Sequence, residues 1–179
     1  MLSTENTVLL IIDVQEKLAR VMAEKESLVV NLQKLIKGAN ILGLPVILTE
    51  QYPHGLGATV PEVMTLLPQI KPLEKMSFSC CDDVNFPEKL KGLNRQQVLV
   101  AGIEAHVCVY QTAAGLLNAG YEVQVVADCV SSRTMENKRI AIHKMRDQGV
   151  GITSTEIVLF ELLKTAENKH FKDISLIVK

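Results

Sequence analysis

Continuous apolar runs, separated by helical stretches, constrain the fold of this chain more than any other feature. The runs are four to seven residues long and rich in Val, Ile and Leu, and most show no polar alternation. Such runs predict strands buried on both faces, as in parallel sheets. The predicted strands are Thr7–Ile12, Pro45–Thr49, Pro72–Phe78, Gln97–Ala101, Tyr121–Ala127 and Val150–Thr153.

Amphipathic helical stretches lie between these runs. The longest is expected from about Ser27, a candidate N-cap, to Leu42, with Gly43 ending it. Others are expected at 61–67, 87–92, 108–120, 136–148 and 155–164, followed by a short apolar tail at 170–178. This alternation predicts right-handed crossovers and a parallel, doubly wound sheet covered on both faces. With no linker or repeat, we expect a single domain spanning residues 1–179.

Charge and composition argue against several classes of partner. Lys plus Arg (19) and Asp plus Glu (20) nearly cancel, and aromatic residues make up 4% with no Trp, so neither nucleic acid nor an anionic membrane is indicated. No apolar run approaches the roughly 20 residues of a membrane-spanning helix. The N-terminus does not resemble a signal peptide, so the four cysteines are expected to be reduced and the protein cytoplasmic.

Several nucleotide and hydrolase motifs are missing. The first strand is followed by Asp13-Val14-Gln15-Glu16 in place of a glycine-rich turn, and there is no phosphate-binding loop. A G-x-S-x-G elbow is also absent, which argues against a serine hydrolase of the α/β-hydrolase kind. We therefore expect no cofactor.

Chemically active side chains do occur where the predicted strands end. They are Asp13, Glu50, Lys75, Cys108 and Asp128. In open α/β sheets, ligands bind at this carboxyl edge. Cys108 also falls at the start of a predicted helix, where the helix dipole and a nearby cation can lower a thiol pKa. The alternative is that Cys108 is a small buried apolar residue.

Three of these side chains form a plausible catalytic set. Lys75 could stabilise a Cys108 thiolate, and Asp13 could take the thiol proton and pass it to a leaving group. The backbone N–H of Cys108 and one from the Ile103–Glu104 turn could form an oxyanion hole. The alternatives are a helix cap for Asp13 and a solvated surface charge for Lys75.

Taken together and in order, these segments resemble the isochorismatase-like cysteine hydrolases. The resemblance covers almost the whole chain, and the family includes isochorismatases, nicotinamidases and N-carbamoyl amide hydrolases. It rests on LLIIDVQ, EKMSFSC, AGIEAHVCVYQTA, VVADCVSSR and GVGITSTEIVLFELL. It implies a three-layer α/β/α sandwich with a six-stranded, mainly parallel sheet. It also implies a catalytic triad of Asp13, Lys75 and Cys108, and a non-proline cis peptide at Ile103–Glu104.

The loop after the second strand departs from the nicotinamidase pattern. Nicotinamidases hold a metal with an Asp-x-His pair and a further His, whereas this chain reads Glu50-Gln51-Tyr52-Pro53-His54. We expect no metal, with Glu50 and His54 as polar pocket or loop residues; a zinc ion bound by both is the alternative. The loop resembles the metal-free, uncharacterised branch of the family.

The remaining candidates surround the predicted site. Gln51 and Tyr52 are candidate substrate contacts, Phe78 a pocket wall, and Ile103 a contact beside the oxyanion turn. Each has a structural alternative, as a surface loop or core residue. His106 could pair with Cys108, although a role in the turn or in an oligomer contact is favoured because Asp13 already offers a base.

The residues predict a cysteine nucleophile, and the resemblance implies a hydrolase that acts on an amide-like C–N bond of a small molecule. One alternative is vinyl-ether hydrolysis of the isochorismatase type, which does not need the thiol. Another is a catalytically silent scaffold of the same fold. A redox sensor using Cys108 or Cys129 lacks an evident resolving partner. We expect a homo-oligomer and leave the substrate open.

Overall fold

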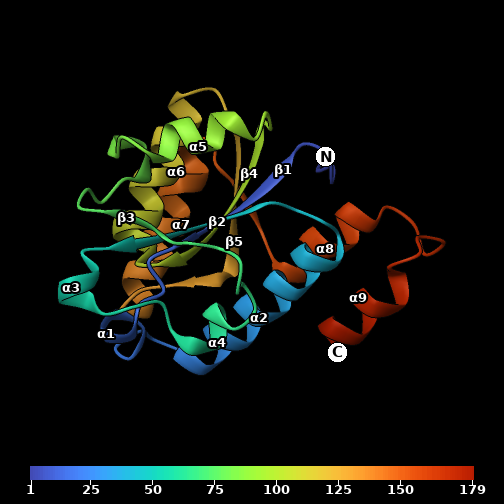
Figure 1. Ribbon diagram of the computed structural model, residues 1–179, viewed down its shortest axis with the longest axis horizontal. Coiled ribbons are helices and arrows are strands. Elements are labelled where there is room, and N and C mark those ends of the chain that lie inside the picture. The colour runs from blue at the N-terminus through green and yellow to red at the C-terminus, as the bar shows by residue number, and fades with distance from the viewer.

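The computed structural model describes residues 1–179 and contains one six-stranded, all-parallel sheet (Figure 1). The strand order is β3-β2-β1-β4-β5-β6. The strands are β1 (Thr7–Ile12), β2 (Val46–Gln51), β3 (Leu73–Lys75), β4 (Gln97–Ile103), β5 (Glu122–Ser131) and β6 (Gly151–Thr153). The predicted α/β class and doubly wound parallel sheet are confirmed.

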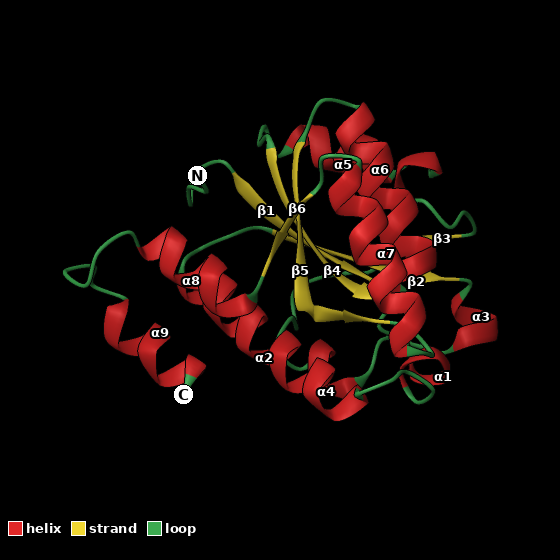
Figure 2. Cartoon of the chain, turned by 180° about the vertical axis from the view of Figure 1, so that it is seen from behind, coloured by secondary structure: helices red, strands yellow, loops and turns green.

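Helices cover both faces of this sheet (Figure 2). They are α1 (Glu16–Ala19), α2 (Lys25–Ile41), α3 (Pro53–Leu56), α4 (Pro61–Met64), α5 (Phe86–Gly92), α6 (Tyr110–Asn118), α7 (Met135–Asp147), α8 (Thr155–Leu163) and α9 (Phe171–Val178). Helices α2 and α8 lie on one face, with α9 outside them, and α5, α6 and α7 lie on the other. A 3₁₀ turn occupies Cys80–Asp82, and a π-helical turn occupies Ala105–Val109.

The buried strands feed two apolar cores, one on each face. Leu9 and Ile11 of β1 pack in the core beneath α2 and α8, whereas Leu10 and Ile12 pack in the core beneath α5, α6 and α7. This division follows from the alternation of side chains along a strand. It explains why β1 is apolar from Val8 to Ile12, as the continuous run predicted.

The order in which strands are added to the sheet reverses between β1 and β4, which lie side by side and parallel at its centre. Gly102 of β4 has φ +117°, and a Cβ there would lie 2.1 Å from the carbonyl oxygen of Ile12. Glycine is therefore needed where β4 passes closest to β1. In sheets with this strand order, ligands usually bind in a crevice beyond the carboxyl ends of the strands, at the point where the order reverses.

Several predicted boundaries differ from the structure. The third strand ends at Lys75, so Phe78 lies in the following loop. The fifth strand continues through Asp128 to Ser131, because a register shift lets its end pair with Gly102 and Ile103. The helix predicted from Cys108 begins at Tyr110, after the π-helical turn.

Three further segments are helical in the structure, although the sequence did not predict helices there. The first turn after β1 is the short helix α1, and the predicted loop after β2 contains α3. The apolar tail forms α9, whose Ile174 is fully buried against α8. None of the helices combines the length and the apolar character needed to cross a membrane.

Candidate active site

A buried ion pair joins the ends of β1 and β3. Lys75 Nζ lies 2.7 Å from Asp13 Oδ2, and both side chains are almost completely buried. Thr49, on the intervening strand β2, donates its hydroxyl to Asp13 Oδ1 at 2.7 Å. The sheet order places these residues together, because the carboxyl ends of adjacent parallel strands meet at one edge. Burial rules out the surface-charge alternative for Lys75.

The ammonium of Lys75 is fully committed to hydrogen bonds. Besides Asp13, it donates to the carbonyl oxygens of Ser77 (3.1 Å) and Phe78 (3.2 Å), which uses all three of its N–H groups. Burial alone lowers the pKa of Lys75, but the neighbouring Asp13 carboxylate outweighs it, so the pKa lies above its ordinary value. Lys75 is therefore a fixed positive charge that also orders the loop after β3.

Cys108 lies in the π-helical turn after β4 and is 4% exposed. Its thiol donates to Gln51 Oε1, with 3.2 Å between sulfur and oxygen. Burial is the largest effect on this thiol, and together with the Asp13 carboxylate it raises the pKa above the ordinary value; Lys75 opposes the shift. The pKa of this thiol is thus raised, contrary to the expectation from a helix start, because burial outweighs the nearby positive charge of Lys75.

Gln15, which the sequence did not single out, fixes the backbone of Gln51. Its buried carboxamide accepts from the N–H of Gln51 at 2.8 Å and donates to the Gln51 carbonyl at 3.0 Å. It also donates to the carbonyl of Gly57 at 2.7 Å. Its position two residues after Asp13 was a signal, but its partners depend on the pairing of β1 with β2.

The turn before Cys108 is tied to the loop after β5. Glu104 Oε2 accepts from the backbone N–H and the Nε–H of Arg133, each at 3.1 Å. The His106 ring nitrogen Nδ1 lies 2.9 Å from Ser132 Oγ, so the ring contacts this loop. The peptide bond between Ile103 and Glu104 is cis. Ile103 itself is completely buried in the core beneath α2 and α8.

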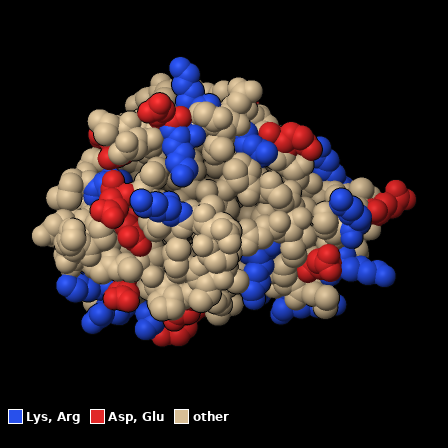
Figure 3. Space-filling model, viewed as in Figure 1, with Lys and Arg blue, Asp and Glu red and all other residues tan.

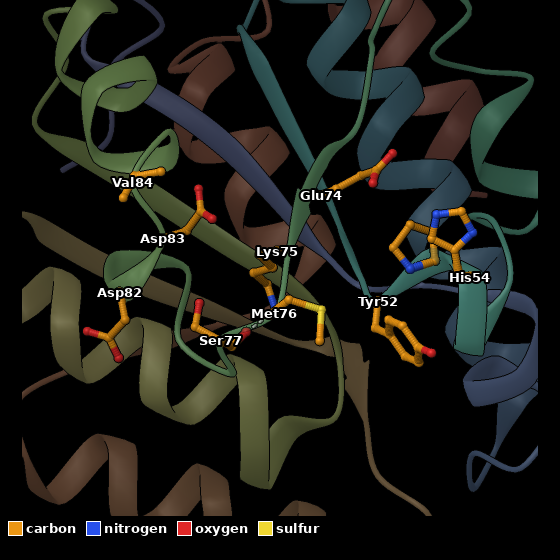
Figure 4. A pocket seen from close by; sticks show the side chains of 10 residues that line it. Tyr52, His54, Glu74, Lys75, Met76, Ser77, Asp82, Asp83 and Val84 are labelled. Carbon is orange, nitrogen blue, oxygen red and sulfur yellow. Dashed lines mark hydrogen bonds between the residues drawn. The ribbon is translucent and has the colours of Figure 1, made fainter.

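A cavity of about 440 Å³ opens beside β3. Its lining residues are Tyr52, Pro53, His54, Glu74, Lys75, Met76, Ser77, Asp82, Asp83 and Val84 (Figure 4). Of the predicted triad, only Lys75 lines it. Tyr52 contributes a half-exposed ring, whereas Gln51, Phe78 and Ile103 are not among its lining residues. Figure 4 shows Glu74 directed away from the ammonium of Lys75.

The other polar strand ends have separate partners. Glu50 Oε1 accepts from the N–H and hydroxyl of Thr59, each at 2.7 Å. Asp128 Oδ1 accepts from the N–H and hydroxyl of Thr155 at the start of α8. No group of three or more His, Cys, Asp and Glu side chains is arranged to hold a metal ion. All four cysteines are free thiols.

Charge on the molecular surface is mixed. Figure 3 shows acidic and basic side chains interspersed on the face that it presents. Among the residues lining the cavity, Lys75 is the one Lys or Arg, and Glu74, Asp82 and Asp83 are acidic.

Comparison with known proteins identifies the family. Residues 7–157 match the isochorismatase domain. Isochorismatase domain-containing protein 2 of Danio rerio is 42% identical over 174 residues, which span 97% of this chain and 87% of that protein. Similarity to this family supports hydrolase activity for the chain.

Solved structures agree. The structure described as the MAR1 ribonuclease from Caenorhabditis elegans has a TM-score of 0.93 and 35% identity, covering 99% of this chain and 91% of that one. The YcaC gene product of Escherichia coli, described as an octameric hydrolase of unknown specificity, shares the fold with a TM-score of 0.90 at 23% identity, covering 99% and 94%. The chain belongs to the isochorismatase family.

Proposed function

We propose that this protein hydrolyses an amide-like C–N bond of a small molecule, with Cys108 as the nucleophile and Asp13 and Lys75 completing a triad. The observation that carries the proposal is the buried Asp13–Lys75 pair, with 2.7 Å between its charged atoms. Removing two opposite charges from water is costly, and such a pair is weak evidence for stability alone. A buried pair beside a thiol at the ligand-binding edge supports a catalytic role.

The proposed chemistry conserves atoms and protons. The Cys108 sulfur attacks the substrate carbonyl carbon while its proton passes to the Asp13 carboxylate. The tetrahedral intermediate collapses as the C–N bond breaks, and the nitrogen leaves with the proton from Asp13. Water then attacks the thioester carbonyl and gives its proton to Asp13. The acid is released, and the proton returns to the Cys108 sulfur.

Proton transfer accompanies attack in this scheme. Burial and the Asp13 carboxylate raise the pKa of Cys108, which favours a protonated resting thiol at neutral pH. An attack that removes the proton as the S–C bond forms avoids an isolated buried thiolate. The fixed charge of Lys75 compensates the negative charge shared by Asp13 and the sulfur during this step.

We assign the oxyanion hole to the backbone N–H groups of Glu104 and Cys108. The Glu104 side chain is held by Arg133, and the Glu104 carbonyl accepts from the N–H groups of Val107 and Val109. This bonding fixes the turn. Preorganised donors of this kind stabilise the developing negative charge without reorganising during the reaction.

The cavity favours a small substrate over RNA. Three similar solved structures carry the name MAR1 ribonuclease, but the one ammonium at this cavity has no N–H group left for a phosphate. The other charged lining residues are acidic, and phosphate binding depends on free Lys and Arg. A cavity of about 440 Å³ is within the usual range for small ligands.

A hydrolysis screen of small amides, ureas and vinyl ethers tests the proposal. Wild-type protein and Cys108→Ala are compared at equal concentration, with a structured RNA as one further substrate. We expect amide or urea turnover by the wild type and none by the variant. Vinyl-ether turnover that survives in the variant would favour the isochorismatase-type reaction, and no turnover of anything would favour a scaffold.

We further propose that copies of the chain associate through the rim of this cavity. Three large apolar side chains that line it are exposed to solvent, Tyr52, Met76 and Val84, and the exposed Phe78 lies in the loop after β3. A second copy covering them would remove apolar surface from water and enclose the cavity. Light scattering should show an oligomer that Val84→Glu weakens; a monomeric wild type would contradict this proposal.

A further inference from the structure

We propose that Gln51 selects substrates that carry an N–H donor beside the scissile carbonyl, and that Gln15 is the positioning residue that holds Gln51 for this task. The inference rests on the proposed function and names its substrate class. It depends on three linked contacts, between Cys108 and Gln51, between Gln51 and Met76, and between Gln51 and Gln15.

The first step is the orientation of the Gln51 carboxamide. Its Nε2 donates to the carbonyl oxygen of Met76 at 3.3 Å, and a carbonyl oxygen can only accept. This contact turns Oε1 toward Cys108, whose sulfur lies 3.2 Å away. The nucleophile is therefore flanked by a hydrogen-bond acceptor.

The second step is the rigidity of that acceptor. Gln15 is completely buried and binds both the N–H and the carbonyl of Gln51 with its own carboxamide. These partners allow only one orientation of the Gln15 carboxamide, because Oε1 faces an N–H group and Nε2 faces two carbonyl oxygens. Gln51 is also paired with Lys75 in the sheet. Its backbone is thus fixed on both sides.

The third step concerns the reaction itself. When the thiol proton passes to Asp13, Gln51 Oε1 loses its donor. An acceptor left unpaired in a partly buried site is costly. A substrate N–H can replace the thiol proton, whereas an ester or a tertiary amide leaves Oε1 without a partner. Gln51 therefore favours primary or secondary amides and ureas during attack.

Two matched alkylating reagents test this without a known substrate. Chloroacetamide carries N–H donors and N,N-dimethylchloroacetamide does not, and both react with thiols at the same carbon. Labelling of Cys108 is followed by peptide mass mapping of the full-length folded protein. Each rate is divided by the rate of the same reagent with glutathione. We expect the normalised rates to favour chloroacetamide by at least about fivefold, the effect of one hydrogen bond.

The variants separate selectivity from packing. Gln51→Met removes the acceptor and should abolish the preference, whereas Gln51→Glu keeps an acceptor and should retain it. Gln15→Met should reduce the preference in the wild-type background and change nothing further in the Gln51→Met background, because it acts through Gln51. Gln33→Met makes the same substitution in α2, where the Gln33 carboxamide donates to the Glu62 carbonyl, and should leave the preference unchanged.

The outcomes distinguish this inference from the function on which it rests. Equal normalised rates in the wild type, or a preference that survives in Gln51→Met, would overturn the selectivity while Cys108 remains a nucleophile. If neither reagent labels Cys108 in the folded protein, both the nucleophile and its selectivity are wrong.

Discussion

Two buried thiols lie near the carboxyl ends of the neighbouring strands β4 and β5, and their surroundings differ. Cys108 follows β4 and Cys129 lies within the last part of β5. Both are free and buried, and burial is the main cause that raises the pKa of each. Each also has an aspartate nearby, Asp13 for Cys108 and Asp128 for Cys129.

The two surroundings differ in charge and in what the aspartate binds. Asp13 forms a buried ion pair with Lys75, whereas Asp128 accepts two hydrogen bonds from Thr155 and forms no ion pair within 4 Å. Cys129 contacts the hydroxyl of Thr155, with 3.1 Å between sulfur and oxygen. Burial and a neighbouring carboxylate are therefore not enough to indicate a nucleophile. The added feature at Cys108 is a second buried charge at the crevice between β1 and β4.

The largest expected contrast is in turnover by the two aspartate variants. Asp13→Asn should lower kcat/KM by about 10²- to 10⁴-fold, because it removes the proposed general base. Asp128→Asn keeps the oxygen that accepts from Thr155 and should stay within about threefold of wild type. The measurement is steady-state hydrolysis of an amide identified by the screen. Equal losses in both variants would show that the effect is structural.

The ion pair predicts the next contrast, in the free energy of unfolding. Lys75→Met leaves the Asp13 carboxylate buried without its partner and should destabilise the protein by about 3–5 kcal/mol. Lys138→Met, in α7 and lining a small cavity together with Asp128, should cost less than about 1 kcal/mol. Urea denaturation at pH 7.5 measures both.

At pH 7.5 the Lys75 ammonium makes its full contribution to the free energy of unfolding. The pKa of Lys75 is raised above its ordinary value of 10.5, so its contribution is fully present below 10.5. It is lost as the pH rises through the higher pKa of the folded state. A Lys75→Met protein as stable as Lys138→Met would contradict a costly buried charge at Asp13.

At alkaline pH, by contrast, Cys108 and Cys129 should contribute equally to the loss of folding stability. An unfolded cysteine ionises near its ordinary pKa of 9.0, whereas burial raises the pKa of both native thiols. The native state then holds the extra proton, so stability falls as the pH rises through 9.0 toward the folded pKa. Between pH 8 and 10, Cys108→Ala and Cys129→Ala should each remove roughly 1 kcal/mol of this loss.

Urea titrations at several pH values in this range provide the measurement. A much smaller change for Cys108→Ala than for Cys129→Ala would show that Cys108 ionises readily in the folded protein. That result would replace the proposed concerted attack by a preformed thiolate.

The sequence predicted those site residues whose positions follow from the ends of the strands. Asp13 follows an apolar run, and Lys75 falls near the end of a shorter, more polar predicted strand. Parallel strands bring their carboxyl ends to one edge, so the pair could be anticipated without a structure. The role of Gln15 could not, because it depends on backbone groups of Gln51 supplied by a neighbouring strand. Local patterns do not contain that register.

The errors have the same origin in tertiary structure. Asp128 was expected in an exit loop, but its strand continues because the register shift against β4 offers new backbone partners. The pKa of Cys108 was expected to fall because a helix start is a local feature, whereas its burial depends on packing beneath α5, α6 and α7. Long-range pairing and burial thus decide what local sequence leaves open.

The smallest expected contrast in stability concerns the threonine hydroxyl that donates a hydrogen bond to each aspartate. Thr49 donates to Asp13 Oδ1 at 2.7 Å, and Thr155 donates to Asp128 Oδ1 at 3.1 Å. Thr→Val removes either hydroxyl with little change in shape. Asp128 Oδ1 keeps the N–H of residue 155, so Thr155→Val should cost about 1 kcal/mol or less.

Thr49→Val should cost more, about 1–3 kcal/mol, because Asp13 is fully buried and its Oδ1 would lose the hydroxyl that it accepts. It should also lower kcat/KM, since Thr49 helps to hold the proposed base, while Thr155→Val should leave turnover unchanged. Paired urea denaturation and rate measurements test both effects. Equal destabilisation with equal turnover in the two variants would mean that the two aspartates are equivalent, and that Lys75 alone distinguishes their sites.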